Sequence, residues 1–239
     1  VYGGMPGQLD VSTHRLDDLY VVGGPLVNDM VLEPGEVLEL PAVHVAFFEG
    51  GHEAGFNRVR RYIHQRVCPK LDGEPPLPPV SYDHWYGLYE GFDEEVLKRQ
   101  ARLCAEMGVE YFVLDATWFP GVKGGDFSPG LGNWTRVDAG KFPRGIEPLA
   151  EYVRRQGMSF GLWFDIEHAH KSSDLFAQHP EWFWDIGTDD AHLDLTLPEA
   201  QEYVIETVSE WVARLDLRWT RWDYNIDPAP YWHKADPTG

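Results

Sequence analysis

The chain of 239 residues is long enough for one good core, and its 43% hydrophobic and 25% charged residues are typical of a globular domain. Acidic residues outnumber basic ones by 39 to 20, and the net charge of -19 repels nucleic acid and phosphorylated ligands. No apolar run approaches the roughly 18 residues of a membrane span, and no signal-peptide pattern is visible, so we expect a cytoplasmic protein without a membrane partner. The two cysteines, Cys68 and Cys104, lack the spacing of a disulfide framework or a metal site, and we expect both to be reduced.

Short β-type runs, separated by turns rich in glycine and proline, characterise the N-terminal part of the chain. They are Leu19–Val22, Val37–Leu40 and Val43–Phe48. A helix is predicted to follow from Gly55 to Val67. The runs are too short to close a sandwich alone, so residues 1–68 are predicted to be the C-terminal part of a β-sandwich domain.

Residues 69–79 contain five prolines, which predict a stiff linker and a domain boundary. After this linker, strand-like and helix-like segments alternate through residues 80–239. Strands are predicted at 80–86, 109–115, 159–165 and 217–223, and helices at 93–107, 146–156 and 198–215, the first helix being capped by Asp93. Such alternation predicts parallel β/α units, so the expected fold class is α/β, the N-terminal half of a (β/α)8 TIM barrel with about four of its units present.

A half barrel leaves the edges of its first and fourth strands unpaired and one flank of its core open, which favours aggregation. We therefore expect the remainder of the barrel to come from a longer chain or from a partner chain.

Three of the predicted strands end in a carboxylate: Asp115, Asp165 and Asp223. Because these strands run in the same direction, their acids lie on one rim of the sheet, where α/β barrels hold their active sites. Asp223 lies between aromatic residues, where an unpaired ionised group is costly, and a carboxylate in such a place more often serves chemistry than packing.

Several ordered motifs carry a resemblance to a known family. They are Asp83-His-Trp85, Val113–Phe119, Leu131–Thr135, Lys141–Gly145, Phe160–Trp163, Ser173–Leu175, His179–Trp182, Leu193–Leu195 and Arg221–Asn225. In this order they resemble successive landmarks of the glycoside hydrolase family 36 α-galactosidases, and residues 34–69 resemble the end of that family's N-terminal β-sandwich. The resemblance implies a retaining, exo-acting α-glycosidase on a TIM barrel, with a small neutral saccharide as substrate and no cofactor. Relatives are often oligomers, so a homo-oligomer is an open expectation.

The resemblance also implies roles for individual residues. The acid of the Trp-Asp pair, Asp223, is the expected nucleophile. The second carboxyl group, the acid/base, is expected on a later strand beyond Gly239, because Asp227 is too close to Asp223 and is followed by Pro228.

Expected substrate contacts are Asp115, Arg221, Asn225, Asp165 and Glu167. The family usually has two adjacent aspartates where this chain has Asp115 and Ala116, and losing one acceptor costs about 1 to 3 kcal/mol, so a sugar without the C6 hydroxyl, such as an arabinopyranoside or a fucoside, becomes conceivable.

Other departures from the family pattern are Arg221 for a lysine, Thr188 for an arginine, and Asp165-Ile-Glu167 for Glu-Pro-Glu. Trp85, Trp118 and Trp163 are candidates for the walls of the sugar pocket, with core packing as the alternative for each.

Two other classes of function remain open. His168 and His170, one residue apart, could hold a metal ion together with a carboxylate in a metal-dependent barrel hydrolase, although no third ligand is visible nearby. The chain could also be a non-catalytic carbohydrate-binding fragment or subunit that has no acid/base.

Overall fold

The computed structural model describes residues 7–15, 18–25, 32–37, 39, 42–70, 73–75 and 77–235. The chain forms two compact units, Val1–Pro78 with Pro237–Gly239, and Pro79–Asp236. None of the described helices is both long and apolar enough to span a membrane. Cys68 and Cys104 are both free thiols, with Cys104 buried.

The first unit contains a β-hairpin and a helix. Strands β1 (Gly7–Arg15) and β2 (Asp18–Pro25) pair antiparallel, with Gly7 opposite Pro25. Helix α1 (His52–Tyr62) continues into a π-helical turn, η1 (Ile63–Val67). The predicted strand at Leu19–Val22 lies within β2, and the predicted helix is found, beginning slightly earlier than Gly55.

The predicted strand at Val43–Phe48 is wrong, because this segment has no strand partner in the described part of the chain. It lies beside α1 instead, where His44 Nδ1 and the Tyr62 hydroxyl are hydrogen-bonded at 2.8 Å. A β-prone sequence forms a strand only when a neighbour accepts its backbone hydrogen bonds. The predicted run Val37–Leu40 lies partly outside the described residues, and the β-sandwich assignment of residues 1–68 stays a prediction.

The second unit is built on a four-stranded parallel sheet. Its strands are β3 (Ser81–Asp83), β4 (Tyr111–Leu114), β5 (Ser159–Phe164) and β9 (Trp219–Trp222), in the spatial order β3-β4-β5-β9. All neighbouring pairs are parallel, as the sequence predicted. The first strand is shorter than the predicted 80–86, because a short helix, α2 (Trp85–Leu88), follows it directly.

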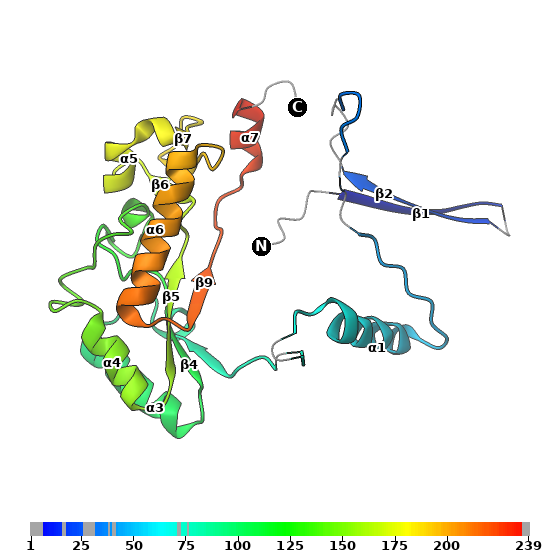
Figure 1. Ribbon diagram of the computed structural model, residues 1–239. Coiled ribbons are helices and arrows are strands. Elements are labelled where there is room, and N and C mark those ends of the chain that lie inside the picture. Colours follow the sequence, from blue (N-terminus) through cyan, green and yellow to red (C-terminus); the bar gives the residue numbers. More distant parts are fainter. Residues whose placement is uncertain are drawn as a thin grey trace. The chain divides into compact units, whose positions relative to one another are not determined.

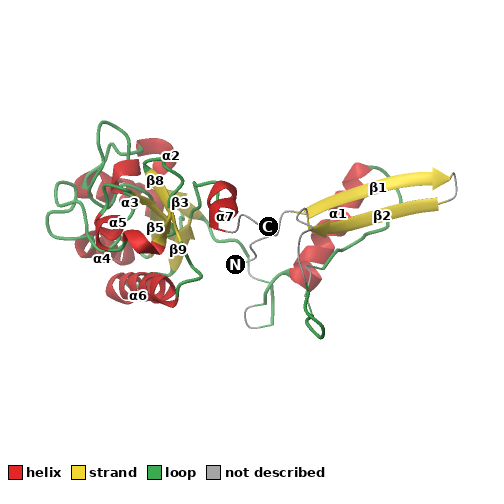
Figure 2. Ribbon diagram, turned by 90° about the horizontal axis from the view of Figure 1, so that it is seen from above, coloured by secondary structure: helices red, strands yellow, loops and turns green. Residues whose placement is uncertain are grey.

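Three helices connect these strands. They are α3 (Glu94–Glu106), α4 (Glu147–Arg155) and α6 (Pro198–Leu215), close to the predicted ranges. Figure 1 shows α4 and α6 beside the sheet. The Asp93 side chain accepts a hydrogen bond from Val96 N at 2.7 Å, so the predicted N-cap is confirmed. Helix α4 contacts α3, α6 and β5, and the same grouping is visible from above in Figure 2.

A small antiparallel sheet, which the sequence did not predict, lies in the segment between β5 and β9. Its strands are β6 (His168–His170), β7 (Phe183–Trp184) and β8 (Asp190–Leu193), with β8 in the centre. A short helix, α5 (Asp174–Gln178), and two 3-10 turns, η2 (Ser128–Gly130) and η3 (Pro180–Trp182), accompany it. The last helix, α7 (Ala229–Ala235), contacts β7.

The core of this unit is rich in aromatic side chains. The largest fully buried ones are Trp118, Trp134, Trp163, Phe112, Phe119, Phe142, Phe160 and Phe164. Burial of each such ring stabilises the fold by about 2 to 3 kcal/mol relative to exposure. The core holds β4 and β5 in place, and these two strands support the acids described next.

Candidate active site

Four carboxylates lie where the parallel strands end. Asp83 is the last residue of β3, and Asp115, Asp165 and Asp223 directly follow β4, β5 and β9. Phe164 is paired with Trp222, so Asp165 and Asp223 directly follow paired residues. Leu114 is paired with Leu162 and Asp83 with Val113, so the acids at the ends of β4 and β3 are each displaced by two residues from the acid of the next strand. The sequence predicted that three of these acids share one rim of the sheet. Because all four strands run parallel, the four acids lie at the same edge.

Arg221, on β9, contacts three of the four acids. Its Nε lies 2.9 Å from Asp115 Oδ2, its Nη1 lies 3.5 Å from Asp83 Oδ2, and its Nη2 lies 3.6 Å from Asp223 Oδ2. The planar guanidinium suits such multiple contacts, whereas the point charge of a lysine does not reach several acids in fixed directions. One cation therefore organises the acidic ends of three strands.

Asp115 is 3% exposed and strongly perturbed. Burial raises its pKa to about 7; the hydrogen bond from Ala116 N and the charge of Arg221 act against the rise, and Asp83 adds to it. Its backbone N–H donates to His84 Nδ1 at 2.9 Å. Burial, together with the charge of Lys141, lowers the pKa of His84 to about 3, so this imidazole is neutral and accepts through Nδ1.

Asp223 is held differently, in a setting that favours its ionised form. Trp163 Nε1 donates to Oδ2 at 3.1 Å, and Tyr224 N donates to Oδ1 at 3.1 Å. Burial raises the pKa of Asp223, but hydrogen bonds from Asn225, Trp163 and Tyr224 and the charge of Arg221 outweigh it and lower the pKa. Its side chain is 32% exposed. Asp223 is thus an ionised carboxylate that a ligand can reach.

The three candidate tryptophans have different environments. Trp118 is fully buried, and its Nε1 donates to Trp163 O at 3.0 Å, so this ring packs in the core, the alternative considered from the sequence. Trp163 is 1% exposed and reaches the rim through its N–H on Asp223, not through an open ring face. Trp85 is half-buried, edge-on to Phe127, at the start of α2.

Asp165 and Glu167 lie at the end of β5. Asp165 is fully buried, and its Oδ2 accepts from Asn225 N at 3.4 Å and lies 3.2 Å from His168 Nδ1. Burial raises the pKa of Glu167; a hydrogen bond from the Trp222 side chain opposes this, and the charge of Asp165 adds to it. Asn225 itself is exposed. Asp165 follows β5, the strand paired with β9, and therefore borders the Asp223 segment. Asp115 follows β4, one strand further from β9, and Arg221 reaches it from β9 itself.

The two histidines proposed as metal ligands have separate partners. His168 contacts Asp165 and Asp190, whereas His170 Nδ1 is 2.7 Å from Ser172 Oγ. Within the described ranges, no three histidine, cysteine or acidic side chains are grouped as metal ligands.

The melibiase family model matches residues 38–231 of the chain. The chain belongs to the melibiase family. It is 31% identical over 236 residues to α-galactosidase AgaA of Geobacillus stearothermophilus, and the aligned region covers 93% of this chain and 31% of that relative. It is 28% identical over 215 residues to an α-galactosidase of Escherichia coli, covering 87% of this chain and 30% of the relative. The chain thus spans less than a third of the length of these melibiase relatives.

Solved structures agree with this assignment. The crystal structure of the glycoside hydrolase family 36 enzyme AgaA matches with a TM-score of 0.60 and 29% identity, over 68% of this chain and 23% of that chain. The α-galactosidase TtGalA of Thermus thermophilus, in complex with p-nitrophenyl α-D-galactopyranoside, matches with a TM-score of 0.56 and 26% identity, over 73% and 35% of the two chains. The expected fold is confirmed: the parallel strands of this chain match part of the TIM barrel of these α-galactosidases.

Sequence reasoning missed two members of the rim, Asp83 and His84. Both were noted only as part of a family landmark, because the expected strand ran on to Tyr86 and hid the fact that it ends in an acid. The signal was present: the Asp83 side chain accepts from Trp85 N at 2.9 Å, a local turn that an Asp-X-X sequence favours.

Proposed function

We propose that this chain carries the nucleophile and part of the sugar-binding rim of a retaining, exo-acting α-galactosidase. The observation that supports this most is Asp223, an ionised and accessible carboxylate at the end of a barrel strand, held by the Trp163 and Tyr224 N–H groups. Membership of the melibiase family supplies the reaction class.

The proposed reaction has two steps. In the first step, an oxygen of Asp223 attacks the anomeric carbon of a terminal α-linked sugar, and the bond to the leaving oxygen breaks as a second carboxyl group donates a proton. In the second step, water releases the sugar from Asp223, with that second group acting as base. The hydrogen bonds to Asp223 keep it deprotonated for attack. The second group, about 5 to 5.5 Å from the nucleophile in retaining enzymes, is proposed to lie on a later barrel strand.

The sugar is proposed to bind on the rim formed by Asp83, Asp115 and Arg221. Asp115 titrates near neutrality, so it can accept a hydrogen bond from a sugar hydroxyl or donate one. Arg221 fixes the orientation of both acids. An AgaA variant has been crystallised with raffinose and TtGalA with an α-galactopyranoside, and we propose a small neutral α-galactoside for this chain as well.

Ala116 is fully buried beside Asp115, and it offers no second acceptor for a hydroxyl at C6. A related sugar without that hydroxyl is therefore part of the proposed substrate range, and the sugar panel below tests this.

The test is mass spectrometry of the chain after incubation with activated fluorinated α-glycosyl fluorides of galactose, fucose and arabinopyranose. Such reagents carry their own good leaving group, so labelling needs no acid catalyst. A sugar adduct on the peptide that contains Asp223 is expected, and Asp223→Asn is expected to abolish it. A chain that is folded by circular dichroism and stays unlabelled by every sugar contradicts the proposal.

The alternative of a non-catalytic carbohydrate-binding subunit makes a different prediction. Such a chain binds galactose, measured by calorimetry, and forms no covalent adduct with any reagent of the panel.

A further inference from the structure

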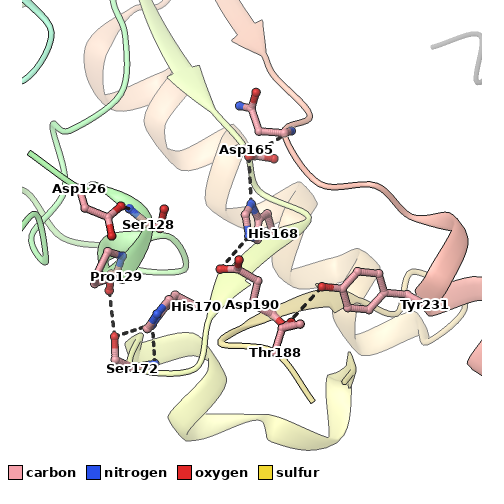
Figure 3. A network of polar contacts seen from close by, with 11 residues as sticks. Asp126, Ser128, Pro129, Asp165, His168, His170, Ser172, Thr188, Asp190 and Tyr231 are labelled. Carbon is pink, nitrogen blue, oxygen red and sulfur yellow. Dashed lines mark hydrogen bonds and ion pairs between the residues drawn. The ribbon is translucent and has the colours of Figure 1, made fainter. Parts of the chain in front are cut away.

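A buried histidine lies between two aspartates close to the nucleophile segment (Figure 3). His168, on β6, is 6% exposed. Its Nδ1 lies 3.2 Å from Asp165 Oδ2, and its Nε2 lies 3.2 Å from Asp190 Oδ1. Asp165 follows β5 and is fully buried, whereas the Asp190 side chain, on β8, is 39% exposed.

Each ring nitrogen of His168 therefore lies at ion-pair distance from a carboxylate, and only the protonated imidazole carries an N–H toward both. The contact with Asp165 is also a hydrogen bond, whereas Nε2 and Asp190 Oδ1 lack hydrogen-bond geometry. Burial lowers the pKa of His168, but the hydrogen bond of Asp165 and the charges of Asp165 and Asp190 outweigh it, and the pKa is raised.

Three other titratable groups lie near this cluster. Glu167 precedes His168 in the chain and interacts with the charge of Asp165, His192 is opposite His168 in the sheet, and the Tyr224 hydroxyl is hydrogen-bonded to His192 Nε2. Burial lowers the pKa of His192, and the charge of His168 adds to this, so of the two imidazoles His168 is the one whose protonated form is favoured.

Asp165 connects this cluster to the nucleophile. The same Oδ2 atom that faces His168 accepts a hydrogen bond from Asn225 N, and the Asn225 side chain is hydrogen-bonded to Asp223. The other oxygen, Asp165 Oδ1, is buried without a hydrogen-bond partner. A buried carboxylate with so few donors needs a partner, and the His168 ring is the side chain in contact with it.

We propose that His168 is a positioning residue for Asp223: as an imidazolium it joins Asp165 to Asp190 and so keeps Asp165 in place as the acceptor that fixes the Asp223–Asn225 segment. The inference rests on the proposed function, because Asp223 is its nucleophile. His168 touches neither the sugar nor the reacting atoms in this proposal. It acts through the orientation of the attacking oxygen.

The first test replaces His168 with glutamine, which keeps a polar side chain of similar size and removes the charge. The labelling rate of Asp223 is measured against the concentration of the fluorinated α-galactosyl fluoride, which separates the maximum rate from the half-saturating concentration. We expect His168→Gln to lower the maximum rate about tenfold or more, since small misplacements of a reacting group have effects of this size, with the half-saturating concentration nearly unchanged. The matched control, His170→Gln, lies two residues along the same strand and is expected to label like the wild type.

The second test uses pH, and it remains valid if His168→Gln does not fold. Labelling by the wild type is expected to slow as the pH rises and His168 loses its proton. Asp190→Asn removes one of the two charges that hold this proton. The fall of the labelling rate at high pH, the basic limb of the pH–rate profile, is therefore expected to occur at lower pH. Asp189→Asn makes the same charge change at the neighbouring, exposed residue and is expected to leave the limb in place. A purely structural role for His168 does not produce this difference.

The outcomes separate the two proposals. A wild-type chain that no reagent labels overturns the proposed function and this inference with it. A labelled wild type, together with an unshifted basic limb in Asp190→Asn, overturns the positioning role alone. An unchanged maximum rate in a folded His168→Gln variant does the same.

Discussion

Replacing Trp118 with phenylalanine distinguishes a core residue from a sugar contact. The ring is fully buried, and its N–H donates to Trp163 O at 3.0 Å. Phenylalanine removes this hydrogen bond, which contributes about 1 kcal/mol. The smaller ring also leaves a space on the order of 40 Å³, which at about 24 cal/mol per Å³ costs a further ~1 kcal/mol. With the lost apolar contact, we expect the free energy of unfolding to fall by about 2 to 3 kcal/mol.

The assay is urea unfolding followed by circular dichroism. For a slope of about 2 to 3 kcal/mol per molar urea, the midpoint is expected to fall by about 1 M. The folded variant is expected to be labelled at the wild-type half-saturating concentration, because Trp118 makes no sugar contact. Trp85→Phe, at a half-buried ring, is the control and is expected to lose less stability. An unchanged midpoint with a raised half-saturating concentration for Trp118→Phe refutes the assignment to the core.

Three further predictions concern the rim. Arg221→Met removes the cation from Asp115 and Asp83. Because Arg221 is one-third exposed, we expect a loss of about 1 to 2 kcal/mol in binding free energy, seen as a roughly 10-fold higher half-saturating concentration of the galactosyl reagent. An equal effect of Arg218→Met, at an exposed residue, contradicts this prediction. Folding raises the pKa of Asp115 from 3.8 to about 7, so its contribution to stability is complete below about pH 4 and is lost as the pH rises to about 7. Asp115→Asn is therefore expected to flatten the pH dependence of the urea midpoint between these values. A variant whose midpoint changes with pH in parallel with the wild type contradicts the shift. Incubation with a chelator is expected to leave the labelling of Asp223 unchanged, and a loss that zinc restores supports the metal-dependent alternative.

Helices and the rim acids were the most predictable features of this chain. Helix α6 has the predicted bounds, Pro198–Leu215, because a proline starts it and its apolar spacing continues to the end. The strand at Val43–Phe48 was wrong, because pairing depends on a neighbour that the local pattern does not contain. The strand predicted through Tyr86 ends at Asp83, where a side-chain hydrogen bond to Trp85 N turns the chain into α2.

Local patterns in the sequence were enough to predict that carboxylates follow parallel strands and share one rim, because the alternation of strands with helices implies the strand direction. The identity of the side chains that meet at this rim depends on the tertiary structure. Trp163 donates to Asp223 across 60 residues of sequence, and Arg221 pairs with an acid on another strand. His168 lies between acids that precede and follow it. Such contacts depend on sheet register and on packing between distant segments, and these are properties of the whole fold and not of any local run of residues.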